Sequence, residues 1–118
     1  MITEDKTIEH LLDLEGVRYV IDEQLGWWVK FEIRKVKPTK ERPHGIKYSL
    51  TLHDRTNQRI MGFDNAHPIN DSKCAHDHWH RDDTNKAKIY SYINAGKLIE
   101  DFWKEVEKMQ KQLAEIKK

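Results

Sequence analysis

The sequence has little that would cross-link the chain or anchor it in a membrane. Its single cysteine, Cys74, cannot form a disulfide within the chain, which agrees with a reducing compartment. No apolar run is long enough to span a bilayer. The first residues, MITEDKTIEH, are acidic, whereas a secretory signal begins basic and continues apolar. We therefore expect a cytoplasmic protein that does not cross a membrane.

The chain is also short and lean in apolar residues. Its 118 residues suffice for one modest core and are too few for two. Hydrophobic residues make up 37% of the chain and charged residues 35%, but four Trp, four Tyr and three Phe argue against intrinsic disorder. We expect a single domain over residues 1–118.

The formal net charge of +1 conceals an uneven distribution. Residues 1–29 carry two basic residues against seven acids, and residues 30–59 carry nine basic residues against three acids. If these basic residues share one face, they form an anion-binding surface on a protein that is almost neutral overall. The alternative is that they are the solvated outer positions of strands, and the charge pattern does not decide between the two.

Strict alternation of apolar and polar residues predicts most of the sheet. It predicts strands at 17–22, 27–36 and 45–53, and after a hairpin loop at 54–58 the chain is expected to return as a further strand at 59–64. Residues 1–15 fit a short helix or a strand equally well. The fold class expected is α+β, with an antiparallel meander of about four strands packed by a long C-terminal helix.

The C-terminal helix is predicted by an apolar stripe at intervals of three and four residues. Asn94 is a plausible N-cap, and the stripe comprises Leu98, Phe102, Val106, Met109, Leu113 and Ile116. Its first half should pack on the sheet. The part beyond Met109 is either a solvated tail or a surface for a partner, which includes a homodimer through this helix.

Six of the seven histidines lie between residues 42 and 81, and most of the chemistry is expected there. Residues 65–86 lack apolar periodicity, as functional loops do, although His78 and His80 alternate as in a strand and would then share a face. Imidazoles titrate near neutrality and can act as acid and base. Lys47 and Arg81 are the candidate cations for a phosphate in such a reaction.

Other interpretations of the same residues remain open. Asp64, His67, His78 and His80 are suitable zinc or manganese ligands, but no established metal-binding spacing is present, so no metal or other cofactor is predicted. Each histidine could equally serve only to hydrogen-bond a polar loop. Tyr48 falls on the apolar side of its strand, where a core role is usual, and Asp64 could cap a turn or orient a histidine.

Four short segments, HGIKYSL, GFDNAH, DHWHR and LIEDFWKEV, together resemble the TumE family, the toxin component of a bacterial type II toxin–antitoxin system. The resemblance spans about Val29 to Val106 in the same order. It implies a small cytoplasmic toxin that inhibits growth and is neutralised by a helix-turn-helix antitoxin. The positions that match the polar residues of the family pattern are His44, Lys47, Tyr48, Asp64, Asn65, His67, His78, His80 and Arg81.

Three functional hypotheses follow. The first is an endoribonuclease toxin that cleaves RNA without metal, with His78 and His80 as acid and base and Lys47 and Arg81 on the phosphate. The second is a non-enzymatic module that binds RNA or a protein through the basic strands and Trp28. The third is a metal-dependent hydrolase that uses the histidine and aspartate cluster.

Overall fold

The computed structural model describes residues 7–40, 43–65, 77–81 and 86–116. Within them the chain forms six strands and two helices. In chain order these are α1 (Ile8–Leu12), β1 (Arg18–Asp22), β2 (Trp27–Lys35), β3 (Ile46–His53), β4 (Arg59–Asp64), β5 (His78–Arg81), β6 (Lys86–Ile89) and α2 (Ala95–Ile116).

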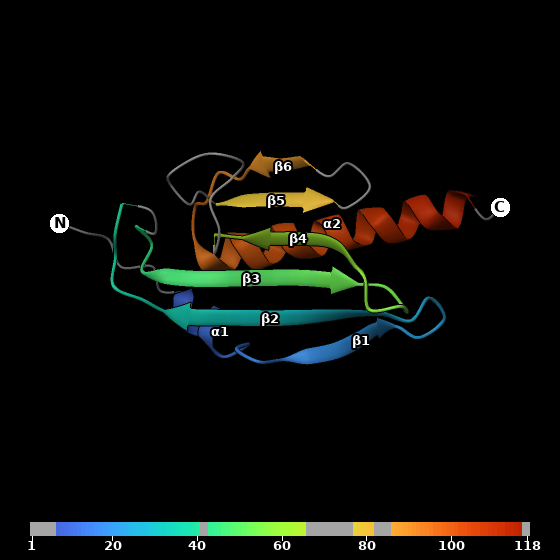
Figure 1. Cartoon of the computed structure of the whole chain (residues 1–118), viewed down its shortest axis with the longest axis horizontal. Helices are drawn as coiled ribbons and strands as arrows, with labels where there is room; N and C mark the ends of the chain where they lie inside the picture. Colours follow the sequence, from blue (N-terminus) through green and yellow to red (C-terminus); the bar gives the residue numbers. More distant parts are fainter. Residues whose placement is uncertain (1–6, 41–42, 66–76, 82–85, 117–118) are drawn as a thin grey trace.

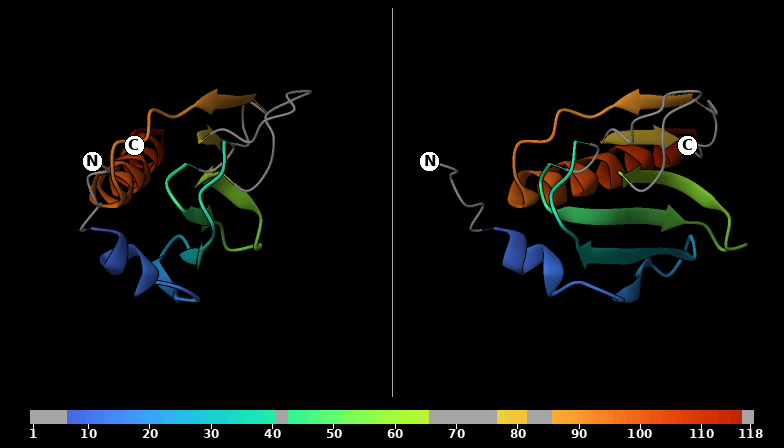
Figure 2. Two further views of the ribbon diagram at one scale, coloured as in Figure 1. Left: turned by 90° about the vertical axis from the view of Figure 1, so that its left-hand side faces the viewer. Right: turned by 60° about the vertical axis from the view of Figure 1, so that its left-hand side comes forward.

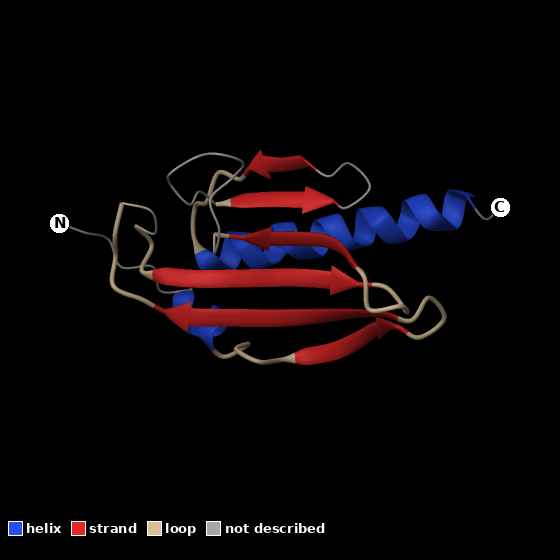
Figure 3. Cartoon of the chain, in the orientation of Figure 1, coloured by secondary structure: helices blue, strands red, loops and turns tan. Residues whose placement is uncertain are grey.

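The strands form one antiparallel sheet in which each strand pairs with its neighbour in the sequence, in the order β1-β2-β3-β4-β5-β6 (Figures 1 and 3). The predicted α+β class, with an antiparallel meander and a long C-terminal helix, is confirmed. Two short strands, β5 and β6, continue the meander beyond the four predicted. Each has only four residues, too few for alternation to identify a strand with confidence.

Helix α2 covers one face of the sheet, as the side views show (Figure 2). Its apolar stripe supplies Leu98, Phe102 and Val106 to the core, and all three are buried. Phe102 packs edge-on against Phe31 of β2, with ring centroids 5.6 Å apart, and against Phe63 of β4, at 6.2 Å. Met109 and Leu113 still pack at the margin of this core, so the predicted stripe contacts the domain over most of its length.

The alternation predicted for β2 and β3 separates two faces of the sheet. Trp27, Val29, Phe31 and Ile33 of β2 are buried towards α2, as are Ile46, Tyr48, Leu50 and Leu52 of β3. The intervening positions lie on the opposite face, which we call the outer face. The register pairs Glu32 with Ser49 and Arg34 with Lys47 across this face.

One end of the sheet, on the left of Figure 1, brings several elements together. There β2 and β4 end, β3 and β5 begin, and α2 starts behind the sheet. Asn94 caps α2 as predicted, because its Oδ1 accepts a hydrogen bond of 2.8 Å from the Lys97 N–H. Of the first fifteen residues, Ile8–Leu12 prove to be helical, and Thr7 just before α1 accepts a 2.8 Å hydrogen bond from Gly96 N–H through its hydroxyl oxygen.

Candidate functional site

At this end of the sheet, one carboxylate joins two of the residues singled out in the sequence. Asp77 accepts a hydrogen bond from the Tyr48 hydroxyl at 2.6 Å and contacts Nε2 of His44 at 2.9 Å. The His44 ring stacks on Tyr92, with ring centroids 3.7 Å apart. We call His44, Tyr48, Asp77 and Tyr92 the Asp77 cluster.

The backbone around the Asp77 cluster is held on both sides. The buried side chain of Asn65 accepts a hydrogen bond from Tyr48 N–H and donates one to the Ile46 carbonyl, both at 2.9 Å. The Tyr90 N–H donates a 2.8 Å hydrogen bond to the carbonyl of Asp77. Asn65 therefore fixes the start of β3, and Tyr90 fixes the residue before β5. Hydrogen bonds thus hold the backbone of both Tyr48 and Asp77 in place.

Electrostatics in the cluster keep the phenol protonated. Burial raises the pKa of Tyr48 far above its ordinary value, and the nearby negative charge of Asp77 and the hydrogen bond to it raise this pKa further. An ionised Asp77 can only accept hydrogen bonds, so Nε2 of His44 donates to it. Asp77 orients His44, whose side chain retains 22% exposure.

The candidate residues of β4 and β5 are placed by the strand register. Asp64, which is only 4% exposed, lies between Ser49 of β3 and His78 of β5 in the ladder. His80 lies opposite Gly62. One row of paired positions therefore runs from Glu32 through Ser49 and Asp64 to His78.

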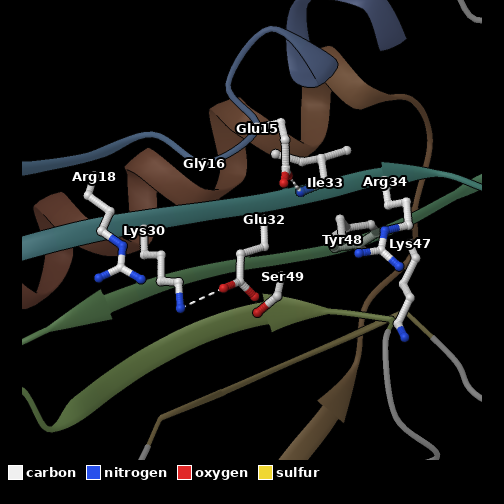
Figure 4. Close-up of a pocket in the computed structure, with 10 residues that line it drawn as sticks. All are labelled: Glu15, Gly16, Arg18, Lys30, Glu32, Ile33, Arg34, Lys47, Tyr48 and Ser49. Carbon is white, nitrogen blue, oxygen red and sulfur yellow. Dashed lines mark hydrogen bonds and ion pairs between the residues drawn. The ribbon is translucent and has the colours of Figure 1, made fainter.

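A second feature lies on the outer face. A cavity of about 420 Å³ opens there, and Figure 4 shows most of its charged side chains on the same side of β2 and β3. We call it the basic cavity; its principal side chains are Arg18, Lys30, Glu32, Arg34, Lys47 and Ser49. Lys30 and Glu32 form an ion pair at 2.5 Å. Basic residues from the stretch 30–59 thus share a face.

The structure divides the predicted site residues into groups. His44 and Tyr48 meet at Asp77, whereas Lys47 lines the basic cavity, which Tyr48 also adjoins. Asp64 is placed beside the β5 backbone. His67 lies outside the described residues. For His78, His80 and Arg81 the structure describes the backbone pairing in the sheet and not the side chains. Their catalytic roles stay predictions.

Three contributors were not singled out as site residues in the sequence. Asp77 stands in the HDHWH segment and could have been found as the carboxylate next to a candidate histidine. Tyr92 carries no sequence signal, since only folding brings its ring onto His44. Arg18 comes from β1, outside the basic stretch, and reaches the basic cavity because β1 pairs with β2.

A metal site receives no support from the part of the chain that the structure describes, where no three candidate ligands gather. Three of the four proposed ligands, His67, His78 and His80, have side chains outside that part. In the same part of the chain, neither helix is long and apolar enough to span a bilayer.

Comparison with known proteins gives one match. The model of the family described as "Toxin TumE" matches residues 13–110, which include both the Asp77 cluster and the basic cavity. Neither the curated proteins nor the solved structures include a match to the chain.

Proposed function

The chain belongs to the TumE toxin family, and we propose that it is the toxin of a type II toxin–antitoxin system that acts as a metal-independent endoribonuclease. A growth-inhibiting protein needs a neutralising partner, and we propose a helix-turn-helix antitoxin in that role. The active site we propose lies where β3, β4 and β5 meet.

The observation that carries this proposal is the pairing of Asp64 with His78. Paired residues in an antiparallel ladder have Cα atoms about 4.5–5.5 Å apart, so a nearly buried carboxylate lies at the position that can orient an imidazole. His80 occupies the next position but one and pairs with Gly62 of β4.

The proposed reaction needs two proton transfers. One histidine of β5 removes the proton of the ribose 2′-hydroxyl, whose oxygen attacks the adjacent phosphorus, and the other protonates the departing 5′-oxygen. The bond from phosphorus to the 5′-oxygen breaks, leaving a cyclic phosphate and a free 5′-hydroxyl. Lys47 and Arg81 would stabilise the extra negative charge on the phosphate.

The Asp77 cluster supports this site from the helix side. Asp77 is the residue directly before His78, and its carboxylate is fixed by Tyr48 while its carbonyl is fixed by Tyr90. The entry of β5 is therefore held in place, which favours the preorganised geometry that acid–base catalysis requires. His44 is an additional candidate base, because its contact with Asp77 fixes the position of its ring.

Induced expression in a bacterium tests the proposal. The wild type and the double variant His78→Ala, His80→Ala would be compared for growth and for fragments in total RNA shortly after induction. The matched control is His10→Ala, which removes an exposed imidazole of α1. Wild type and control should arrest growth and fragment RNA, whereas the double variant should do neither while remaining folded by circular dichroism.

Two outcomes would contradict the proposal. A folded double variant that is as toxic as the wild type would remove the two histidines from the mechanism. Cleavage by the purified protein that disappears with EDTA and returns with a divalent metal would favour the metal-dependent hydrolase instead.

A further inference from the structure

We propose that the basic cavity binds the phosphates of a single-stranded RNA segment and directs that segment across the outer face to the histidine positions of β5. This inference rests on the proposed function, because it names how the substrate of that same site is held. Its central observation is the cross-strand pair of Arg34 and Lys47.

Arg34 and Lys47 are like charges at directly paired positions, an arrangement that costs stability in an antiparallel sheet. The ion pairs of the described residues include neither of them; within the cavity, Glu32 is engaged by Lys30 instead. The sheet thus keeps two uncompensated cations side by side, and a bound anion would relieve their repulsion.

The cations form a track and not a single cluster. Arg18 and Lys30 are paired across β1 and β2, and Arg34 and Lys47 are paired across β2 and β3. Lys30 and Arg34 are four positions apart in β2, which corresponds to about 13 Å along a strand. An extended polyanion can contact both pairs at once, whereas one small anion cannot.

The remaining side chains of the cavity favour RNA over an acidic peptide. Glu32 and Ser49 lie between the two cationic pairs and present hydrogen-bond acceptors. RNA offers donors to such acceptors through its 2′-hydroxyls and exocyclic amines, whereas Asp and Glu side chains offer none when ionised. Glu32 and Glu15 repel phosphates and carboxylates alike, so the preference for RNA rests on its hydrogen-bond donors.

The track also leads to the proposed active site. The row Glu32, Ser49, Asp64 and His78 crosses the sheet from β2 to β5, and three strand spacings amount to about 14 Å. A strand of RNA held at the basic cavity therefore reaches the β5 histidine positions within a few nucleotides. Binding and cleavage are separated on the sheet, so they can be tested separately.

The test measures binding of a fluorescein-labelled single-stranded RNA of mixed sequence by fluorescence anisotropy. All proteins carry His78→Ala and His80→Ala, so that the RNA stays intact. Arg34→Gln removes one cation of the track. Lys35→Gln is the matched control, because it removes the same charge from the next residue of β2, which does not line the cavity.

Arg34→Gln should weaken RNA binding several-fold and reduce the slope of log K against log salt by about 0.7, the value for one phosphate contact on a single strand. Lys35→Gln should leave both quantities nearly unchanged. The unfolding transition of Arg34→Gln should be equal to that of its parent or slightly higher, since a repulsion is removed.

Three results would overturn the inference: no RNA binding by the parent protein, equal loss in both variants, or a poly-glutamate peptide that binds as tightly with the same dependence on Arg34. The last result would assign the cavity to an acidic protein partner. Failure of the proposed function looks different, because RNA would then bind through Arg34 although the wild type does not cleave it.

Discussion

The hydroxyl of Tyr48 donates a 2.6 Å hydrogen bond to Asp77, a residue 29 positions later in the chain. The phenol is almost completely buried and the carboxylate largely so, with 11% of its side chain exposed. This bond therefore connects the interior of β3 to the first residue before β5, across a segment of the chain that includes all of β4.

Tyr48→Phe should destabilise the protein by about 1–3 kcal/mol, because it leaves one oxygen of a largely buried carboxylate without its donor. Urea unfolding followed by tryptophan fluorescence measures the change. Tyr19→Phe is the control, since Tyr19 is 44% exposed, and it should change the free energy of unfolding by less than about 0.5 kcal/mol. Equal losses in the two variants would show that the bond to Asp77 contributes little.

Asn65→Asp should be costly at neutral pH and much less so in acid. The change replaces the donor to the Ile46 carbonyl by an oxygen and buries a carboxylate, which should raise the pKa of the new residue above that of an ordinary aspartate. The penalty is then absent below the unfolded-state pKa of about 3.9 and grows as the pH rises towards the folded-state pKa.

The difference in unfolding free energy between the wild type and Asn65→Asp, followed from neutral pH into acid, tests this prediction. A loss of about 2–5 kcal/mol at neutral pH is expected. Asn65→Ala supplies the comparison, because it removes both hydrogen bonds without adding a titratable group and its penalty should not depend on pH. A penalty for Asn65→Asp that is constant with pH would contradict the prediction.

His53 should make the fold less stable in mild acid. Burial lowers the pKa of its imidazole below the ordinary 6.5, and the positive charges of Lys30, Arg59 and Arg18 lower this pKa further. A depressed pKa means that the stabilisation is fully present above about pH 6.5 and is lost as the pH falls through the folded-state pKa. Unfolding free energies at several pH values below 7 measure it.

The variant His53→Phe keeps a ring against Trp28, on which the wild-type imidazole stacks at 4.1 Å between ring centroids. It removes the proton-binding group, so the acid-dependent loss of stability assigned to His53 should be present in the wild type and absent from the variant. Identical pH profiles for the two proteins would rule out this role.

Gly45→Ala should cost about 1–2 kcal/mol and also impair the toxin. Gly45 has φ of +75°, a conformation that L-residues adopt at this cost, while a new Cβ would meet only ordinary contacts there. Gly16→Ala, at φ of +78° with open space around it, should cost about as much. Gly45 adjoins His44 of the Asp77 cluster, so growth arrest should also weaken for Gly45→Ala, whereas Gly16, which lines the basic cavity, serves as the control for stability alone.

The sheet was largely predictable because β2 and β3 alternate over enough residues to fix both their type and the face that packs against α2. Phe31 and Leu50 fall in the core as the period of two requires. The short strand β6 was not predictable, since four residues such as KAKI carry no pattern. The site was predictable as a set of residue types, His44 and Tyr48 among them, but their meeting at Asp77 depends on the loop before β5.

The basic cavity shows the same limit. The excess of positive charge in residues 30–59 was visible in the sequence, but the position of Arg34 directly opposite Lys47 depends on the register between β2 and β3. Loop length and turn chemistry set that register, and the connection KPTKERP gives no clear indication of it. Arg18 joins the cavity only because β1 folds back on β2.

The neighbour-to-neighbour order of the sheet has a kinetic consequence. Because each strand pairs with the one next in sequence, most long-range structure forms by closing short loops, and such low contact order is associated with fast folding. Packing of α2 on the sheet and on α1 is long-range instead; the hydrogen bond between Thr7 and Gly96, for example, joins residues 89 positions apart. We expect the docking of α1 against α2 to be a late folding step, because it brings together elements from the two ends of the chain.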